Sequence, residues 1–275
     1  MNIPELTEIL INAGIEENEA KKEIKMLLEH FCNLTEKDII LGKKVSKEEF
    51  NILKENILYR IESKTPIQYI IGEAWFMNNF FKVTPDVLIP RDETEILVRK
   101  AIEIVNTESF EDVLDIGTGS GCIACTIAKN TNATVLGVDI SSDALRIALD
   151  NVTKLGINNK AVFRKSNLFE KIREGETFDL IVSNPPYIPI GTQLSPEVMK
   201  EPTNALFAEE NGLYYYRKII EDAPKYLNSN GYLMFELGIN ESDSVKTMMQ
   251  KDFFEIEIIP DLAKIDRVIL GKLKA

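Results

Sequence analysis

The chain has 275 residues, enough for one large domain or two of moderate size. Apolar residues make up 44% and charged residues 28%, close to the average for water-soluble globular chains, which excludes disordered, collagen-like and disulfide-scaffold proteins. The 32 Lys and Arg residues against 44 Asp and Glu residues give a net charge of −12. This charge argues against stable binding to nucleic acid, because phosphate contacts need clustered cations.

Histidine and cysteine are scarce. The single histidine, His30, lies far in sequence from every motif below, so we expect no His-based triad and no metal site, and we expect His30 to pack or to lie at the surface. Cys32, Cys122 and Cys125 are too few and too scattered for a secreted disulfide framework. We expect reduced thiols.

The chain predicts no membrane segment. No stretch approaches the ~20 apolar residues of a membrane span. The first residues carry Glu5 and Glu8 instead of the basic residues of a leader. We therefore expect a cytoplasmic protein without a membrane partner.

Residues 1–64 predict a small helical domain. Apolar residues recur at helical spacing from Pro4 to about Lys64, with polar breaks between the runs. Ser46 followed by Glu49 is the pattern of a capping box at the start of the last long helix, and Pro66 indicates that this helix has ended.

Residues 65–84 predict a linker that contains a β-hairpin. Two aromatic, strand-like runs, Trp75–Met77 and Phe80–Val83, flank Asn78-Asn79. Asparagine tolerates the left-handed backbone that a tight hairpin turn needs.

Residues 85–275 alternate between strand and helix patterns. This rhythm predicts an α/β domain built on a parallel sheet with helices on both faces. Only a short turn separates the last two strands, so we expect the sheet to end in an antiparallel hairpin. The seven predicted strands are Val113–Ile116, Thr134–Asp139, Ala161–Phe163, Leu180–Ser183, Tyr232–Leu237, Phe254–Ile259 and Arg267–Leu270.

The first of these strands runs into a glycine-rich turn and then a helix. Gly117, Gly119 and Gly121 allow a tight turn and a close approach of the backbone to a ligand. Their spacing, G-x-G-x-G, differs from the pattern of pyrophosphate-binding sites. Asp139 ends the next strand, where a carboxylate can accept hydrogen bonds from both ribose hydroxyls of a nucleoside. An ordinary tight turn and an N-capping Asp are the structural alternative.

Asn184-Pro185-Pro186-Tyr187 follows the fourth predicted strand, beside the crevice where such sheets bind ligands. The prolines stiffen a backbone whose carbonyl oxygens stay free to accept hydrogen bonds. A planar NH₂ group suits this loop, with its hydrogens on the Asn184 side-chain oxygen and the Pro185 carbonyl, and with Tyr187 stacked on the flat group. A proline-rich loop with a core tyrosine is the alternative.

With these motifs the chain resembles class I S-adenosylmethionine-dependent methyltransferases, and more closely the protein-glutamine methyltransferases of peptide chain release factors. The resemblance runs from about residue 66 to the carboxyl end and implies a Rossmann-like methyltransferase sheet preceded by a helical substrate-recognition domain. The further segments that carry it are Pro66-Ile-Gln-Tyr-Ile-Ile-Gly72, Val87-Leu-Ile-Pro-Arg-Asp-Glu-Thr-Glu95, Glu201-Pro-Thr-Asn-Ala-Leu206 and Asn211-Gly-Leu-Tyr-Tyr-Tyr-Arg-Lys-Ile-Ile220.

The resemblance also implies roles for single residues. The expected cofactor contacts are Gly117, Thr118, Gly119, Ser120, Gly121, Asp139, Leu168 and Asn184. The substrate glutamine is expected on Asn184, Pro185, Pro186 and Tyr187, of which Asn184, Pro185 and Tyr187 are the catalytic set. Leu168 stands where some members have Trp against the adenine, Asn167 stands where Asp is common, and Asp92 replaces a usual proline.

Two further patterns have competing interpretations. Cys122-Ile-Ala-Cys125 fits a redox motif at a helix start, but buried cysteines in this place also serve as small apolar residues. Arg91, Glu93 and Glu95 fit either a solvated helix start or a brace on the substrate side or between domains.

The expected reaction is methyl transfer from S-adenosylmethionine to the glutamine of the Gly-Gly-Gln loop in class I release factors. The same Asn-Pro-Pro-Tyr loop suits an exocyclic amine of a nucleic-acid base, and this alternative is opposed by the net charge. A non-enzymatic nucleoside sensor is a third interpretation, in which the loop has no use.

Overall fold

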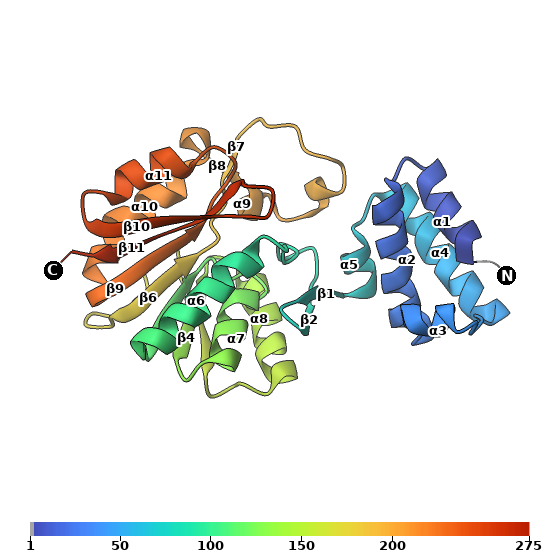
Figure 1. Ribbon diagram of the computed structural model, residues 1–275, viewed down its shortest axis with the longest axis horizontal. Helices are drawn as coiled ribbons and strands as arrows, with labels where there is room; N and C mark the ends of the chain where they lie inside the picture. The colour runs from blue at the N-terminus through green and yellow to red at the C-terminus, as the bar shows by residue number, and fades with distance from the viewer. Residues whose placement is uncertain (1–2, 275) are drawn as a thin grey trace. The chain divides into compact units, whose positions relative to one another are not determined.

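The computed structural model describes residues 3–274, which divide into two compact units (Figure 1). One unit is formed by the chain up to Glu73 together with Leu194–Lys200. The other unit is formed by Ala74–Gln193 and by the chain from Glu201 onward. No helix within the described residues is long and apolar enough to cross a membrane.

The first unit is helical. Its helices are α1 (Ile3–Asn12), α2 (Glu17–Cys32), α3 (Glu36–Ile40), α4 (Lys47–Ser63) and α5 (Ile67–Ile71). Their apolar faces enclose one core of Leu6, Leu10, Ala20, Ile24, Leu27, Leu28, Phe50, Leu53, Ile57 and Ile67. The predicted capping box at Ser46 is present: the Ser46 hydroxyl accepts from the Glu49 N–H at 3.1 Å, and the Glu49 carboxylate accepts from the Ser46 N–H at 2.6 Å.

A buried arginine holds together three segments of the helical unit. Arg60 on α4 donates from Nε and Nη2 to one carboxylate oxygen of Glu23 on α2, at 3.1 and 3.0 Å. Its Nη1 donates to Glu197 at 3.2 Å. The short segment Leu194–Lys200, which ends in the 3₁₀ turn η1 (Val198–Lys200), is thereby bonded to helices of the helical unit.

The second unit begins at Ala74, within a two-stranded hairpin of β1 (Glu73–Phe76) and β2 (Asn79–Lys82). Its turn lies at Met77-Asn78, one residue before the asparagine pair that the sequence suggested. Both turn residues have positive φ, 47° and 62°, as a two-residue hairpin turn requires.

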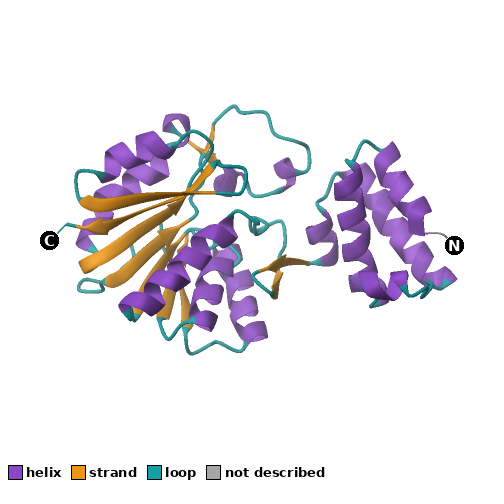
Figure 2. Cartoon of the chain, viewed as in Figure 1, coloured by secondary structure: helices purple, strands orange, loops and turns teal. Residues whose placement is uncertain are grey.

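The second unit is built on the predicted seven-stranded sheet, which Figure 2 shows with its covering helices. The strand order is β10-β11-β9-β6-β3-β4-β5, and all neighbours are parallel except for β11, which is antiparallel to both β9 and β10. The strands are β3 (Asp112–Ile116), β4 (Thr134–Asp139), β5 (Ala161–Lys165), β6 (Phe178–Ser183), β9 (Leu227–Glu236), β10 (Phe253–Pro260) and β11 (Asp266–Leu273).

Helices cover both faces of this sheet, as predicted. One apolar cluster joins the sheet to α6 (Thr94–Glu108), α7 (Cys122–Asn130) and α8 (Ser142–Leu155), and a second joins it to α10 (Tyr214–Asp222) and α11 (Ser242–Met249). The shorter elements are β7 (Ile188–Pro189), α9 (Thr203–Leu206), β8 (Phe207–Ala208), η2 (Glu210–Gly212) and η3 (Ala223–Lys225).

Several strand boundaries differ from the sequence prediction, and the start of β9 differs the most. β9 begins at Leu227, five residues earlier than predicted, through a polar stretch that pairs irregularly with β6. Before it, α10 ends at Asp222 and the chain continues as a 3₁₀ turn that contains Pro224, because proline interrupts helical hydrogen bonding.

The strand order reverses between β3 and β6. The chain passes from β3 outward to β4 and β5 and then returns to the other side of β3 as β6. Sheets of this type bind ligands at the carboxyl ends of the strands where the order reverses.

Candidate active site

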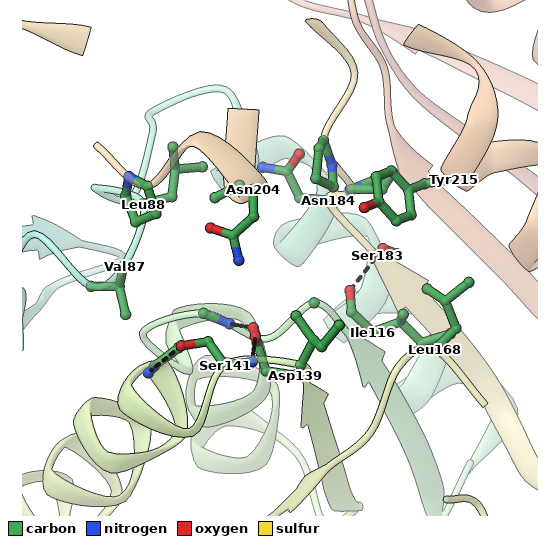
Figure 3. A pocket seen from close by; sticks show the side chains of 18 of the residues that line it. Val87, Leu88, Ile116, Asp139, Ser141, Leu168, Ser183, Asn184, Asn204 and Tyr215 are labelled. Atoms are coloured by element: carbon green, nitrogen blue, oxygen red, sulfur yellow. Dashed lines mark hydrogen bonds between the residues drawn. The ribbon is translucent and has the colours of Figure 1, made fainter. Parts of the chain in front are cut away.

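A pocket lies at this reversal and is formed within the second unit (Figure 3). Its wall comes from the residues that follow β3, β4, β5 and β6, from the loop before α6, and from α9 and α10. The polar residues of the wall include Asp139, Ser141, Ser183, Asn184, Asn204 and Tyr215.

The glycine turn after β3 forms the floor of the pocket. Gly117, Gly119 and Gly121 have φ of 74°, 54° and 77°, which side-chain-bearing residues rarely adopt. The N–H groups of Gly117 and Thr118 donate to the Val138 carbonyl at 2.9 and 3.0 Å, which joins the turn to β4.

Only part of the predicted glycine motif lines the pocket. Gly117 and Gly119 lie in the wall, whereas Thr118 and Ser120 are buried behind it. A side chain at Gly121 would come within 3.1 Å of Ala148 and Phe163, so this glycine serves the packing of α7 against α8 and β5. The predicted cofactor roles of Thr118, Ser120 and Gly121 stay predictions.

The buried carboxyl group of Asp115 holds the glycine turn through hydrogen bonds. It accepts from the Thr118 hydroxyl at 2.6 Å and from the Ala124 N–H at 3.2 Å. Burial raises the pKa of Asp115 to about 7. Sequence reasoning missed this residue, although an acid inside a buried strand was a visible signal.

Asp139 lies at the end of β4 with its carboxylate held by two backbone groups. Its oxygens accept from the Gly119 N–H at 2.9 Å and from the Ser141 N–H at 2.8 Å, and both bonds are drawn in Figure 3. Burial raises the pKa of Asp139 above its usual value, although the backbone bonds act in the opposite direction. A carboxylate has about four lone-pair directions, so these bonds leave acceptor capacity toward the pocket.

Leu168 and Ile140 contribute apolar side chains to the wall of the pocket. The Leu168 φ of 48° is left-handed, and the Ser166 hydroxyl holds the loop by donating to the Leu168 carbonyl at 2.7 Å. These side chains present an apolar surface to a flat base, although residue 168 is not aromatic.

Asn184 begins the loop after β6. The Ser183 hydroxyl donates to the Ile116 carbonyl at 2.7 Å, which holds the start of the loop against β3. The Asn184 Nδ2 donates to the Thr94 hydroxyl oxygen at 3.3 Å. Its Oδ1 is buried and has no hydrogen-bond partner among the described residues.

Pro185 and Pro186 line the pocket, but Tyr187 lies beside it. Tyr187 packs against the apolar cluster that joins the sheet to α10 and α11. It also lies close to Gly212 and Gly238. A side chain at Gly238 would come within 2.9 Å of its ring, and one at Gly212 within 2.3 Å of its carbonyl oxygen. Burial raises the pKa of the Tyr187 phenol well above its usual value, so the phenol is neutral.

Asn204 and Tyr215 are pocket residues that the sequence analysis did not single out. Figure 3 shows the Asn204 amide directed into the pocket, toward the side of Asp139. Tyr215, on α10, lines the same pocket near Asn184. Both lie in segments that carried the family resemblance, but nothing in their spacing distinguished them from their neighbours.

Charged residues before α6 and in its first turn act as braces within the second unit. Arg91 pairs with the buried Glu201, whose other oxygen accepts from the Ile89 N–H at 3.1 Å. Glu95 accepts from the Met77 N–H at 2.9 Å and so ties α6 to the hairpin turn.

The cysteine pair has no redox environment. Cys122 and Cys125 are buried on α7, and burial raises the pKa of Cys122 to about 12 and that of Cys125 further. Both thiols are therefore protonated at neutral pH, which contradicts the redox interpretation. Among the described residues, no group of three or more His, Cys, Asp or Glu side chains is placed to hold a metal ion.

Two family models match the chain: one described as a methyltransferase domain over residues 108–269, and one described as a PrmC N-terminal domain over residues 5–72. Three similar relatives are named release factor glutamine methyltransferase. The one from Geobacter sulfurreducens is 38% identical over 96% of this chain and 93% of its own length. The one from Bacillus subtilis is 36% identical over 94% and 92%, and the one from Fusobacterium nucleatum is 39% identical over 84% and 67%.

Similar solved structures support the fold alone, because their sequences are distant. A ribosomal protein L11 methylase from Lactobacillus delbrueckii has a TM-score of 0.53 at 19% identity, over 72% of this chain and 87% of that one. A 16S rRNA N2 G1207 methyltransferase from T. thermophilus, in complex with AdoMet and guanosine, has a TM-score of 0.55 at 18% identity, over 74% and 50%.

Proposed function

The chain belongs to the family of release factor glutamine methyltransferases, and we propose that it transfers a methyl group from S-adenosylmethionine to a glutamine side-chain amide nitrogen in class I peptide chain release factors. It is an S-adenosylmethionine-dependent enzyme. The observation that carries the proposal is a single pocket that brings the glycine turn, Asp139 and Asn184 together.

Asp139 and the glycine turn are proposed to hold the nucleoside part of the cofactor. The Asp139 carboxylate has acceptor capacity left for ribose hydroxyls, and its bonds to Gly119 and Ser141 fix its orientation. Leu168 and Ile140 offer apolar surface to the adenine. S-adenosylmethionine supplies an electrophilic methyl group on a sulfonium centre.

Asn184 is proposed to position the substrate amide. A glutamine nitrogen is a weak nucleophile because its lone pair is delocalised into the carbonyl, so orientation is the main contribution the protein can make. The buried and unpartnered Asn184 Oδ1 is an acceptor for one amide hydrogen, and the Pro185 carbonyl is proposed to accept the other.

These two acceptors also stabilise the positive charge that develops on the nitrogen. In the proposed reaction the amide nitrogen would acquire the methyl group as the bond from that group to sulfur breaks, and the proton that the nitrogen then loses would pass to water. No strong base is needed before transfer, because that proton becomes acidic only then. Pro186 stiffens the loop, and Tyr187, beside the pocket, is proposed to contact the flat amide.

The helical unit is proposed to recognise the release factor, and the second unit to form the methyltransferase domain. The predicted linker of residues 65–84 is divided between them, because α5 groups with the helical unit and the hairpin from Ala74 onward with the second, and Leu194–Lys200, within the predicted domain of residues 85–275, groups with the helical unit. The family match over residues 5–72 supports a distinct amino-terminal part. The net charge of −12 supports a protein substrate over stable nucleic-acid binding. We place the reaction in the cytoplasm because release factors act in translation.

Incubation with labelled S-adenosylmethionine tests this function. We expect label on an intact class I release factor, no label on a release factor whose Gly-Gly-Gln glutamine is replaced by alanine, and none on DNA or RNA. Label on nucleic acid instead would favour the base-amine alternative. Cofactor binding without transfer to any of these substrates would favour a nucleoside sensor.

We predict that Asn184→Ala lowers the turnover rate at saturating cofactor. Loss of one preorganised polar contact costs ~2.7–4 kcal/mol of barrier, or roughly a hundredfold to a thousandfold in rate. The unfolding transition is the control, because the prolines and β6 hold the loop without this side chain, and the saturating cofactor removes any effect of the variant on cofactor binding. A folded variant that methylates the release factor within a few-fold of the parent would contradict the role of Asn184.

A further inference from the structure

A chain of hydrogen bonds leads from the pocket to a buried carboxyl group. Asn184 donates from Nδ2 to the Thr94 hydroxyl oxygen at 3.3 Å, and the Thr94 hydroxyl donates to Glu236 Oε2 at 2.6 Å. Thr94 is the first residue of α6 and Glu236 is the last residue of β9. Each is only 2% exposed, so water does not compete for these bonds.

The direction of these bonds determines which way the Asn184 amide faces. A threonine hydroxyl has one hydrogen, and here that hydrogen is used on the Glu236 carboxylate. Only lone pairs of the hydroxyl oxygen remain for Asn184, so the NH₂ end of its amide must face Thr94. The carbonyl end then faces the other way, and its Oδ1 is the buried atom that lacks a partner among the described residues.

We propose that Thr94 and Glu236 are positioning residues, which through this chain of hydrogen bonds hold the Asn184 oxygen toward the substrate amide. The proposal rests on the function proposed above. Without this chain of hydrogen bonds, the Asn184 amide can rotate so that its NH₂ group faces the substrate. An NH₂ group cannot accept a hydrogen from the substrate nitrogen.

The nearest cations have other partners. Arg91 pairs with Glu201, and Arg267 donates to Asp261 at 3.0 Å and lies 3.9 Å from Glu93. The end of β9 is fixed separately, because the Tyr216 hydroxyl donates to the Glu236 backbone carbonyl at 2.8 Å. The carboxylate is thus held in place and directed at the Thr94 hydroxyl.

The first test compares two variants of Thr94. Thr94→Val keeps the shape of the side chain but removes the hydroxyl, whereas Thr94→Ser keeps the hydroxyl. The loss of one hydrogen bond of this kind corresponds to about a tenfold change. We expect Thr94→Val to lower kcat on release factor about tenfold with unchanged S-adenosylmethionine affinity, and Thr94→Ser to stay within about threefold of the parent.

A double-mutant cycle separates positioning from structural support. Thr94→Val is introduced into the Asn184→Ala protein, which no longer has the amide to be oriented. We expect no further loss of kcat there, because two residues that act through one contact are not additive. An equal loss in both backgrounds, or a Thr94→Val protein as active as the parent, would overturn the proposal. A parent without activity on release factor would instead refute the proposed function.

Glu236→Gln gives an independent readout through the pH profile. Burial raises the pKa of Glu236 to about 7. Protonated Glu236 can donate a hydrogen to the Thr94 hydroxyl oxygen, which reverses the direction of the hydrogen bonds that orient the Asn184 amide. We therefore expect kcat of the parent to fall as the pH decreases through about 7. The charged or titratable groups that face Glu236 are Glu93, Arg91, Arg267, Tyr187, Tyr216 and Cys122.

Glutamine keeps an acceptor oxygen for Thr94 but does not titrate. In Glu236→Gln we therefore expect kcat, measured at saturating S-adenosylmethionine so that titration of Asp115 under the glycine turn does not affect cofactor occupancy, to show no decrease near pH 7. If kcat of the parent and of Glu236→Gln decreased in the same way at acid pH, Glu236 would have no part in orienting Asn184. A folded Glu236→Gln protein whose acid limb has disappeared would support the proposal even if Thr94→Val failed to fold.

Discussion

At the scale of single residues, the site depends on side chains whose polar atoms are held by the protein before any ligand arrives. Asp139 is oriented by two backbone N–H groups and Asn184 by one hydroxyl, so neither side chain has to lose much freedom on binding. Preorganisation of this kind stabilises a bound ligand without new contacts.

We predict that Asp139→Ala weakens S-adenosylmethionine binding. The ribose hydroxyls lose an ionised acceptor worth ~1.5–3 kcal/mol, or roughly tenfold to a hundredfold in affinity. Titration calorimetry measures the change. The control is Asp143→Ala, which removes an exposed acid from the first turn of α8 and should leave affinity unchanged. Unchanged affinity in Asp139→Ala would remove this residue from the cofactor site.

At the scale of elements, the glycine turn, β4 and β5 pack around one aromatic ring. Phe163 on β5 pairs in register with Gly137 on β4. A side chain at Gly137 would come within 2.5 Å of the Phe163 ring and 2.7 Å of the Thr118 hydroxyl, and one at Gly121 within 3.1 Å of the same ring. Both glycines therefore make room for this ring behind the pocket floor.

We predict that Gly137→Ala destabilises the protein by about 1–3 kcal/mol, because the added methyl group overpacks the space under Phe163. Denaturant unfolding measures the loss. The matched comparison is Gly137→Ala in a Phe163→Leu background, where the smaller side chain should reduce the cost of the methyl group. An equal cost in both backgrounds would show that Phe163 is not the source of the strain.

At the scale of the whole molecule, the chain contributes to the helical unit twice, first up to Glu73 and again at Leu194–Lys200. Arg60 is the group that bonds the second contribution to the first, through Glu197 on one side and Glu23 on the other. Burial raises the pKa of Glu23, and the Arg60 charge counteracts that shift. The pair is therefore a buried charge pair whose partners depend on each other.

We predict that Arg60→Ala destabilises the helical unit by about 3–5 kcal/mol, because it leaves the Glu23 carboxyl group buried without its cation. The free energy of unfolding measures the effect. The double variant Arg60→Met with Glu23→Leu removes both charges and should recover most of the loss. An Arg60→Ala protein as stable as the parent would mean that the pair contributes no net stability.

Much of this architecture was readable from the sequence because its signals are local. The helical spacing before residue 64, the capping box at Ser46, the seven strands and the glycine turn each depend on residues a few positions apart. The carboxyl ends of β3, β4 and β6 meet at one edge in any sheet of this class, which agrees with the sequence-based expectation that Asp139 and Asn184 both contact the cofactor and with the single pocket that they line.

Only the tertiary structure decided the partners of these residues. Thr94 lies 90 positions from Asn184 and 142 from Glu236, and no period or spacing in the sequence joins them. The same holds for Arg60 and Glu197, which are 137 positions apart. Contacts of this kind follow from the order in which strands pack and from which polar groups are buried together. Local patterns therefore predict the helices and strands and the edge of the sheet at which a ligand binds. The orientation of the Asn184 amide depends instead on the packing of α6 and β9 around it.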